Sequence, residues 1–257
     1  MEMRSFGDLS GPFIPPARGG QASSMIVLLH GWGADGNDLA DLAYPFSVRF
    51  PGAAFFVPNG PAPCKMNPAG REWFDIDDRV NGPVAAAPVI DAAITAALAA
   101  LKLPASALAL AGFSQGGMMS LHCGLRHAAP PAAIVSFSGA LLRHDDLGDG
   151  VNYPPVLLVH GTDDQVVPFA LQSAAYDVMQ SRSIMVETLA CDGFGHGINS
   201  DGLSAAIAFL AKYLPAAQEW RVRRLMACLA PLDSCYPKTM MCADKCRKTA
   251  FHSTIQS

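Results

Sequence analysis

Ser114 is the residue with the clearest chemical potential, because it lies in the sequence GFSQGG at residues 112–117. An apolar run at 108–111 precedes this segment and a helix-like pattern follows it, so the serine lies at a strand-to-helix corner. A G-x-S-x-G sequence in that position is typical of a nucleophile elbow, where a tight turn strains the serine backbone and flanking glycines avoid collisions. The motif alone has low specificity, so its interpretation as a catalytic serine depends on the other residues of the chain.

A nucleophilic serine needs a base and a carboxylate, which follow an elbow serine in the order aspartate or glutamate, then histidine. His196 is the best-placed base, because it lies in the glycine-rich loop 193–197 between a predicted strand and a predicted helix. His122 and His127 lie instead on the helix that begins at the elbow, and His252 is in the C-terminal tail.

Two adjacent aspartates are candidates for the residue that orients this base. Asp163 and Asp164 follow the apolar run 156–159, which is typical of a buried strand. Either carboxylate can accept a hydrogen bond from Nδ1–H of His196 and stabilise the imidazolium that forms during proton transfer. We favour Asp164 of the two.

Acyl transfer also needs backbone donors for the oxygen that becomes negative. The N–H of Gln115 follows the serine and lies at a helix N-terminus, which makes it one donor. A second is expected from the loop after an early strand, and Trp32, between Gly31 and Gly33, fits that position. Taken alone, His30 and Gly31 are equally well explained as a strand-ending turn with a hydrogen-bonded histidine.

Alternating short strands and longer helices are predicted to position these residues. The alternation indicates βαβ units, and therefore an α/β fold with a mostly parallel sheet. Ligands bind such sheets beyond the carboxyl ends of the strands, where each candidate motif lies. Strands are expected at 25–29, 53–57, 108–111, 133–137, 156–159 and 185–189, and helices at 85–102, 116–128, 169–181 and 201–213.

The composition indicates one enzyme-sized domain with no feature of a nucleic-acid-binding protein. The chain has 257 residues and a formal net charge of −4, and no basic stripe interleaved with aromatic residues lies in the first 215 positions. The N-terminus lacks the apolar region of a secretory signal, so a cytoplasmic location is expected. The apolar stretch 84–103 contains Pro88, Asp91 and Lys102, which favours a packed amphipathic helix over a membrane span.

The chain changes character after Pro215. Residues 216–257 carry seven Lys or Arg against three Asp or Glu, whereas residues 1–215 carry eleven against nineteen. We therefore predict a catalytic domain at 1–215 and a basic, cysteine-rich, poorly ordered extension at 216–257 that is dispensable for the chemistry. The spacing of the four tail cysteines matches no common zinc site, and no metal is expected.

Taken together, these motifs resemble the phospholipase/carboxylesterase family of α/β-hydrolases, which includes acyl-protein thioesterases and bacterial carboxylesterases. The resemblance spans about residues 10–215 and implies an α/β-hydrolase fold with helices on both faces of the sheet. It also implies the role of each site residue: Ser114 as nucleophile, Asp164 and His196 as its partners, and Trp32 and Gln115 as oxyanion donors. Its matching segments are 28–39, 71–75, 112–117, 138–139, 160–164 and 195–197.

The substrate expected from the sequence is an acyl ester or thioester. The connection 138–155 is too short for a helical cap, which predicts an open site without a cap domain. Trp73 and Phe74 match a segment that the family places near its substrate pocket, with simple core packing as the alternative. Leu141 and Leu142 are candidates for an apolar groove and could equally belong to the core.

No cofactor is required by this chemistry, and a homodimer is possible. Acyl-protein thioesterase or lysophospholipase activity is an alternative main role. A non-catalytic hydrolase-fold binding protein is the alternative from another class.

Overall fold

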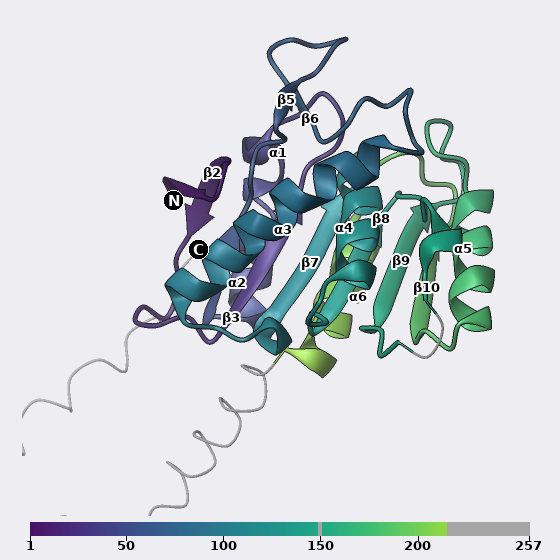
Figure 1. Ribbon diagram of the computed structural model, residues 1–257. Helices are drawn as coiled ribbons and strands as arrows, with labels where there is room; N and C mark the ends of the chain where they lie inside the picture. Colours follow the sequence, from purple (N-terminus) through teal and green to yellow (C-terminus); the bar gives the residue numbers. More distant parts are fainter. Residues whose placement is uncertain (149–150, 215–257) are drawn as a thin grey trace, which may run out of the picture. The chain divides into compact units, whose positions relative to one another are not determined.

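A computed structural model describes residues 1–148 and 151–214 of the chain. Its centre is an eight-stranded sheet with the order β1-β2-β4-β3-β7-β8-β9-β10 (Figure 1). The strands from β4 to β10 in this order are parallel, and β1 and β2 are antiparallel to their neighbours. The bounds are β1 (Glu2–Phe6), β2 (Leu9–Ile14), β3 (Ser24–Leu29), β4 (Ala53–Phe56), β7 (Leu108–Phe113), β8 (Ala133–Phe137), β9 (Val156–Gly161) and β10 (Val186–Cys191).

Helices cover both faces of this sheet because its central strands are apolar on both sides. In β3, for example, Met25 and Val27 belong to one buried cluster and Ile26 to another. The helices α3, α4 and α5 pack on one face, and α1, α2 and α6 pack on the other. Their bounds are α1 (Gly36–Ala40), α2 (Ala43–Arg49), α3 (Gly82–Leu101), α4 (Gln115–Arg126), α5 (Ala170–Ser181) and α6 (Ser200–Tyr213).

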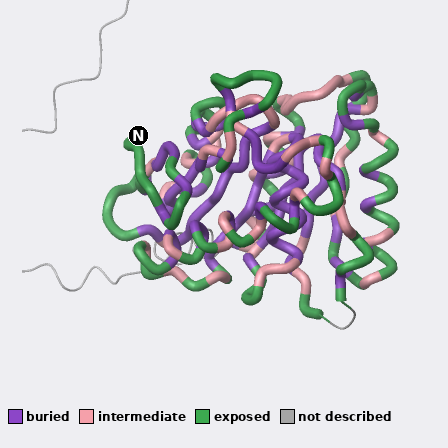
Figure 2. The backbone as a smooth tube through the Cα atoms, turned by 45° about the horizontal axis from the view of Figure 1, so that its top comes forward, coloured by how far each residue is buried: buried purple, intermediate pink, exposed green. Residues whose placement is uncertain are grey.

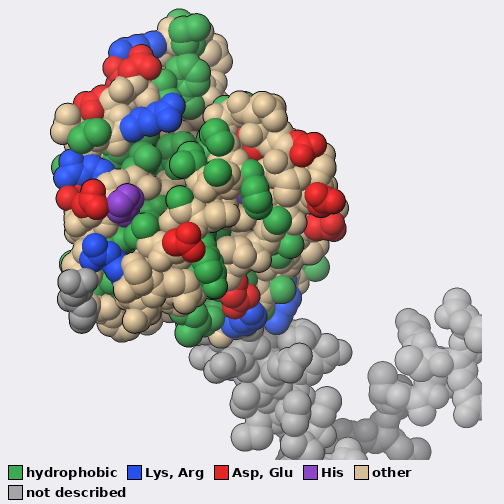
Figure 3. Space-filling view, turned by 90° about the vertical axis from the view of Figure 1, so that its right-hand side faces the viewer, with side chains coloured by type: hydrophobic (Ala, Val, Ile, Leu, Met, Phe, Trp, Pro, Cys, Tyr) green, Lys and Arg blue, Asp and Glu red, His purple; other side chains and the backbone are tan. Residues whose placement is uncertain are grey.

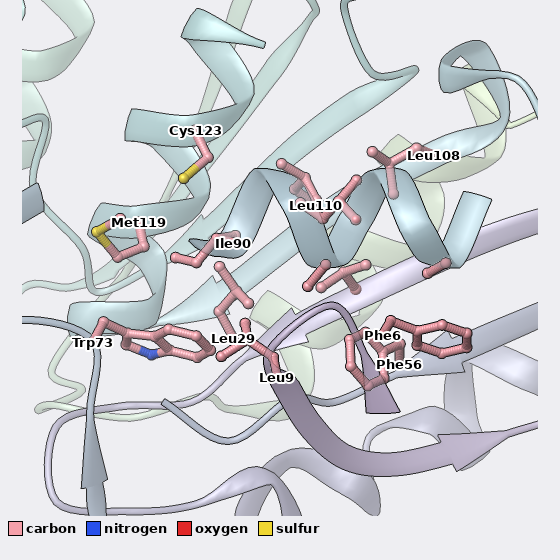
Figure 4. Close-up of a cluster of buried hydrophobic side chains, with 14 of the residues drawn as sticks. Phe6, Leu9, Leu29, Phe56, Trp73, Ile90, Leu108, Leu110, Met119 and Cys123 are labelled. Carbon is pink, nitrogen blue, oxygen red and sulfur yellow. The ribbon is translucent and has the colours of Figure 1, made fainter. Parts of the chain in front are cut away.

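The buried segments run through the centre of the domain (Figure 2), and their side chains form a cluster on each side of the strands. The cluster under α3 and α4 contains Leu29, Trp73, Ile90 and Met119, which Figure 4 shows with their neighbours. Trp73 comes from the loop region after a small antiparallel hairpin, β5 (Ala62–Pro63) and β6 (Arg71–Glu72). A loop segment is therefore fixed by burial in the main core.

The expected α/β-hydrolase fold is confirmed, and all six expected strands and four expected helices are present within a few residues. The sequence pattern does not predict the short elements β1, β2, α1, α2 and the β5–β6 hairpin. Four of the five residues of β1 are exposed, and β2 contains Gly11 and Pro12, so neither strand has the apolar pattern of the central sheet. Pairing between these edge strands, and of β2 with β4, decides their structure.

The helix α3 is a core element, as predicted. By length and composition it is the one helix in the described part of the chain that is suited to cross a membrane. It packs against the sheet and α4, however, with Ile90, Ile94 and Leu98 in the core. Over the connection after β8, the described residues form only the short 3₁₀ helix η2 (His144–Asp146).

Candidate active site

Ser114 lies between β7 and α4 with a backbone conformation of φ 55° and ψ −117°. Such a positive φ is strained for a residue other than glycine. The flanking glycines permit the turn: a Cβ on Gly112 would lie 2.2 Å from the carbonyl oxygen of Gly116, and one on Gly116 would lie 1.9 Å from that of Leu29. The predicted elbow geometry is therefore confirmed.

Asp164 and His196 lie on the loops that follow the neighbouring strands β9 and β10, and Oδ2 of Asp164 lies 2.7 Å from Nδ1 of His196. Because an ionised carboxylate only accepts hydrogen bonds, Nδ1 is the donor and Nε2 of this cavity-lining ring is left as an acceptor. The Asp164 side chain is fully buried, whereas that of His196 is 17% exposed.

The other carboxylate oxygen of Asp164 is also fixed. Oδ1 accepts hydrogen bonds from the N–H groups of Val166 at 2.9 Å and Val167 at 2.8 Å. Burial by itself raises the pKa of this carboxyl, but the hydrogen bonds from His196, Val167 and Val166 outweigh it and hold the pKa below its usual value. Asp164 therefore remains ionised at neutral pH.

Backbone hydrogen bonds hold the two loops against each other. The N–H of Thr162 donates to the carbonyl of Cys191 at 3.0 Å, and the N–H of Asp163 donates to that of Phe194 at 2.9 Å. The ring of Phe113, the residue before the serine, lies 4.8 Å from the ring of His196, measured between centroids. The histidine is thus positioned from the acid loop on one side and from the elbow on the other.

The N–H of Trp32 has no hydrogen-bond partner among the described residues. Its loop is nevertheless rigid: Ala34 donates to the carbonyl of Gly31 at 3.3 Å, and Gly33, with φ of 80°, donates to that of Arg71 at 2.9 Å. Gln115 is the first residue of α4, where backbone N–H groups lack an intrahelical acceptor.

A cavity of about 410 Å³ brings Ser114, His196 and Trp32 together. Its other walls are mainly apolar and include Leu141 and Leu142. The remaining lining residues are Gly31, Ala34, Asp38, Ile76, Arg79, Phe113, Met118, Ala140, Val166, Val167, Pro168 and Leu171. Figure 3, viewed from the side of α5 and β10, shows hydrophobic side chains exposed among charged ones; Val166 and Leu171 are among the exposed apolar residues of the domain.

Trp73 and Phe74 lie outside the lining of this cavity, in contrast to Leu141 and Leu142. Both aromatic side chains are buried, and their backbone groups bond to the side chain of Gln115. Ile76, Val166 and Leu171 also line the cavity and are not predicted from the sequence. They are single apolar residues on separate segments, and no motif marks them.

No group of three or more His, Cys, Asp or Glu residues is placed to hold a metal ion within residues 1–148 and 151–214. The cysteine-rich segment 216–257 lies outside the described residues, and its predicted disorder and dispensability are untested.

The comparisons with known proteins identify the class to which this fold and site belong. The sequence model of the Phospholipase/Carboxylesterase family of α/β-hydrolases matches residues 14–214, and the chain belongs to this family. It is an ester-hydrolysing enzyme of the serine hydrolase type.

Two relatives with named activities cover most of the chain. Esterase YpfH of Escherichia coli is 26% identical over 200 residues, which is 76% of this chain and 84% of the relative. Acyl-protein thioesterase 1 of Schizosaccharomyces pombe is 28% identical over 202 residues, which is 73% of this chain and 89% of the relative.

Solved structures agree with the fold. The crystal structure of esterase PE8 has a TM-score of 0.76 and 40% sequence identity, and the match covers 80% of this chain and 99% of that one. SOBER1 of Arabidopsis thaliana, at 23% identity and a TM-score of 0.66, shares the fold over 74% of this chain and 99% of its own.

Proposed function

We propose that this enzyme hydrolyses carboxylic esters or thioesters of acyl chains through an acyl-enzyme on Ser114. The observation that carries the proposal is the 2.7 Å hydrogen bond between Asp164 and His196, with His196 lining the same cavity as Ser114. A strained elbow serine, a histidine with a free Nε2 and a buried carboxylate are the parts of a serine-hydrolase triad.

In the first half of the reaction, Oγ of Ser114 attacks the acyl carbonyl while Nε2 of His196 takes the serine proton. The imidazolium is stabilised by the ionised Asp164 and gives its proton to the leaving alcohol or thiol. In the second half, His196 deprotonates a water molecule that attacks the acyl-enzyme. The imidazolium then returns this proton to Oγ of Ser114 as the bond from Oγ to the acyl carbon breaks. The carboxylic acid then leaves.

The N–H groups of Trp32 and Gln115 stabilise the negative oxygen of both tetrahedral intermediates. Support comes from their positions: Trp32 lines the cavity on a rigid turn, and Gln115 begins the helix that follows the nucleophile. Donors fixed before the reaction cost no reorganisation when the charge develops.

The acyl chain lies along the apolar walls of the cavity, including Leu141 and Leu142. Both an ester-cleaving and a thioester-cleaving role are compatible with this site, since the attack is on the same carbonyl carbon. The acyl-protein thioesterase 1 of Schizosaccharomyces pombe supports the thioesterase alternative. A cytoplasmic location, a homodimer and the division into a catalytic domain at 1–215 and an extension at 216–257 are further proposals from the sequence.

Labelling with a fluorophosphonate, which phosphonylates an activated serine, tests the site. Wild-type protein is expected to be labelled at Ser114, and Ser114→Ala is expected to lose labelling and about a millionfold in turnover, as when other serine-hydrolase nucleophiles are removed. A Ser114→Ala variant that hydrolyses activated esters at the wild-type rate would refute the assignment. Wild-type protein that resists labelling would favour a non-catalytic binding protein.

A further inference from the structure

Three consecutive residues, Glu72, Trp73 and Phe74, connect the two proposed oxyanion donors. Glu72 accepts a hydrogen bond from the indole Nε1 of Trp32 at 2.8 Å through Oε2. Trp73 and Phe74 bond to the side chain of Gln115. All three residues are buried but lie outside the lining of the active-site cavity. Their hydrogen bonds therefore hold Trp32 and Gln115 on the side away from the cavity and do not contact a substrate.

The indole of Trp73 is held by the core and in turn holds the Trp32 loop. Its apolar part belongs to the cluster that contains Leu29 and Met119 (Figure 4). Its Nε1 donates to the carbonyl of His30 at 2.8 Å, and its ring lies 5.0 Å from the His30 ring between centroids. The start of the oxyanion loop is thus tied to a rigid side chain.

His30 connects Trp73 to the peptide between Gly31 and Trp32, which carries the proposed N–H donor. Its Nε2 accepts from the N–H of Gly60 at 2.9 Å, so Nδ1 carries the proton and donates to the carbonyl of Gly31 at 2.7 Å. Burial lowers the pKa of His30, which keeps the ring neutral. The Gly31 carbonyl and the Trp32 N–H belong to one trans peptide and point in opposite directions, so a bond to the carbonyl fixes and polarises the N–H.

The side-chain amide of Gln115 fixes the second donor against the same segment. Its Oε1 accepts from the N–H of Trp73 at 2.9 Å, and its Nε2 donates to the carbonyl of Phe74 at 2.7 Å. Gln115 is fully buried, and these two bonds satisfy both ends of its amide. The backbone N–H of the same residue is the proposed oxyanion donor.

We propose that Trp73 and the side chain of Gln115 are positioning residues that set the spacing of the two oxyanion donors, Trp32 and Gln115. The inference rests on the proposed function of Ser114 and adds a role to two side chains that touch neither substrate nor reacting atoms. A misplacement of about 1 Å in a catalytic group costs up to about a hundredfold in rate. The segment 72–74 then holds the two donors at the spacing that the transition state requires. Loss of its hydrogen bonds to Trp32 and Gln115 is expected to lower kcat more than it changes KM.

The variant Gln115→Met tests this role, with Gln172→Met as its matched control. Gln172 is also buried, and its amide donates to two backbone carbonyls, those of Leu158 at 3.0 Å and Leu189 at 3.1 Å, away from the donors. Each variant loses the two hydrogen bonds of a buried glutamine amide. Only Gln115→Met is expected to lower kcat, by about ten- to hundredfold, with KM changed less than about threefold.

Inhibition by a trifluoromethyl ketone provides a second measurement. Ser114 Oγ bonds to the ketone carbon, the serine proton moves to His196, and the ketone oxygen becomes an anion in the oxyanion hole. Its affinity for Gln115→Met is expected to fall by about the factor lost in kcat. Trp73→Phe, which keeps a ring but removes the indole N–H, is expected to change kcat and affinity in the same direction.

The inference is overturned if Gln115→Met and Trp73→Phe lose no more kcat or inhibitor affinity than Gln172→Met. Ser114→Ala, measured in parallel, distinguishes failure of the positioning role from failure of the proposed function. If Ser114→Ala is inactive, equal losses in the three other variants reject only the positioning role. If it remains active, the proposed function fails and the inference fails with it.

Discussion

Asp164 and His196 share a 2.7 Å hydrogen bond across two loops that lie 32 residues apart in the sequence. The loops follow adjacent parallel strands, so the register of β9 and β10 brings them together. Because Val166 and Val167 bind the other carboxylate oxygen, Asp164 cannot turn away from the histidine without losing two further bonds.

Replacing Asp164 by asparagine is expected to lower kcat by about ten thousandfold. The neutral amide cannot stabilise the imidazolium, and its NH₂ group favours the wrong histidine tautomer. Steady-state kinetics on an activated acyl ester measure the loss. Asp163→Asn is the matched control, because Asp163 is adjacent and exposed and is expected to keep near wild-type activity. The opposite ranking would assign the acid role to Asp163.

The low pKa of Asp164 predicts a loss of stability in acid. Its folded pKa lies below the unfolded value of about 3.9, so its contribution is present above about pH 4 and is lost as pH falls through the folded pKa. Urea unfolding between pH 2.5 and 7 measures this dependence. Asp164→Asn is expected to flatten the curve below about pH 4. Equal slopes of the free energy of unfolding against pH in the wild type and in Asp164→Asn would show that Asp164 is not the source of the acid sensitivity.

The lowered pKa of His122 predicts a second pH dependence of the free energy of unfolding, at higher pH than that of Asp164. Burial, followed by the charges of Arg126 and Arg143, lowers its pKa from 6.5 to about 4, so the unfolded chain binds more protons between these values. The free energy of unfolding is therefore expected to fall as the pH drops from 6.5 to about 4, by on the order of a few kcal/mol in total. His122→Gln should lose this component in denaturant titrations. An unchanged slope in the variant would show that His122 is not its source.

Gly116→Ala is expected to destabilise the protein and to lower its activity. The new Cβ would lie 1.9 Å from the carbonyl oxygen of Leu29 and 2.5 Å from that of His30, so backbone leading into the oxyanion loop must move. Gly124→Ala on the same helix is the control, because its Cβ would lie 2.5 Å from Cδ1 and 2.8 Å from Cγ1 of Ile134, a buried side chain, and not against backbone of the oxyanion loop. Both variants are expected to lower the melting temperature, whereas kcat should decline in Gly116→Ala only. An equal loss of kcat in the two variants would contradict the role of Gly116 at the elbow.

Leu141 offers a test of the acyl site. It lines the main cavity and also a second one of about 180 Å³, near α5. Leu141→Trp is expected to obstruct long chains, lowering kcat/KM for a dodecanoyl ester by at least about tenfold while sparing the acetyl ester. A panel of p-nitrophenyl esters measures the profile, with acetate as the internal control. A uniform loss over all chain lengths would place the acyl chain elsewhere.

Much of the fold was predictable because the central strands and long helices carry strong apolar patterns. The run at 133–137 and the helix over 85–102 were placed within a few residues of β8 and α3. The short elements β1, β2 and α2 have weak patterns of their own. Their structure depends on partners that are remote in the sequence, such as β4 for β2 and α6 for α2.

The sequence alone determined the chemical groups of the proposed site. Ser114 is marked by its glycines, and the order of an aspartate at 163 or 164 and then His196 follows from the requirements of acyl transfer. The hydrogen bond to His196 distinguishes Asp164 from Asp163. Each motif ends a predicted strand, so their convergence at one edge of the sheet was also predictable.

Only the tertiary structure decided which side chains surround and support those groups. The family resemblance implied that Trp73 and Phe74 lie near the substrate, with core packing as the alternative. In the structure both are buried outside the cavity lining and bond to Gln115. An aromatic pair in a loop has the same sequence pattern whether it faces a ligand or the core. Its role depends on packing against α4 and the end of β3, and contacts between such distant segments are absent from local sequence.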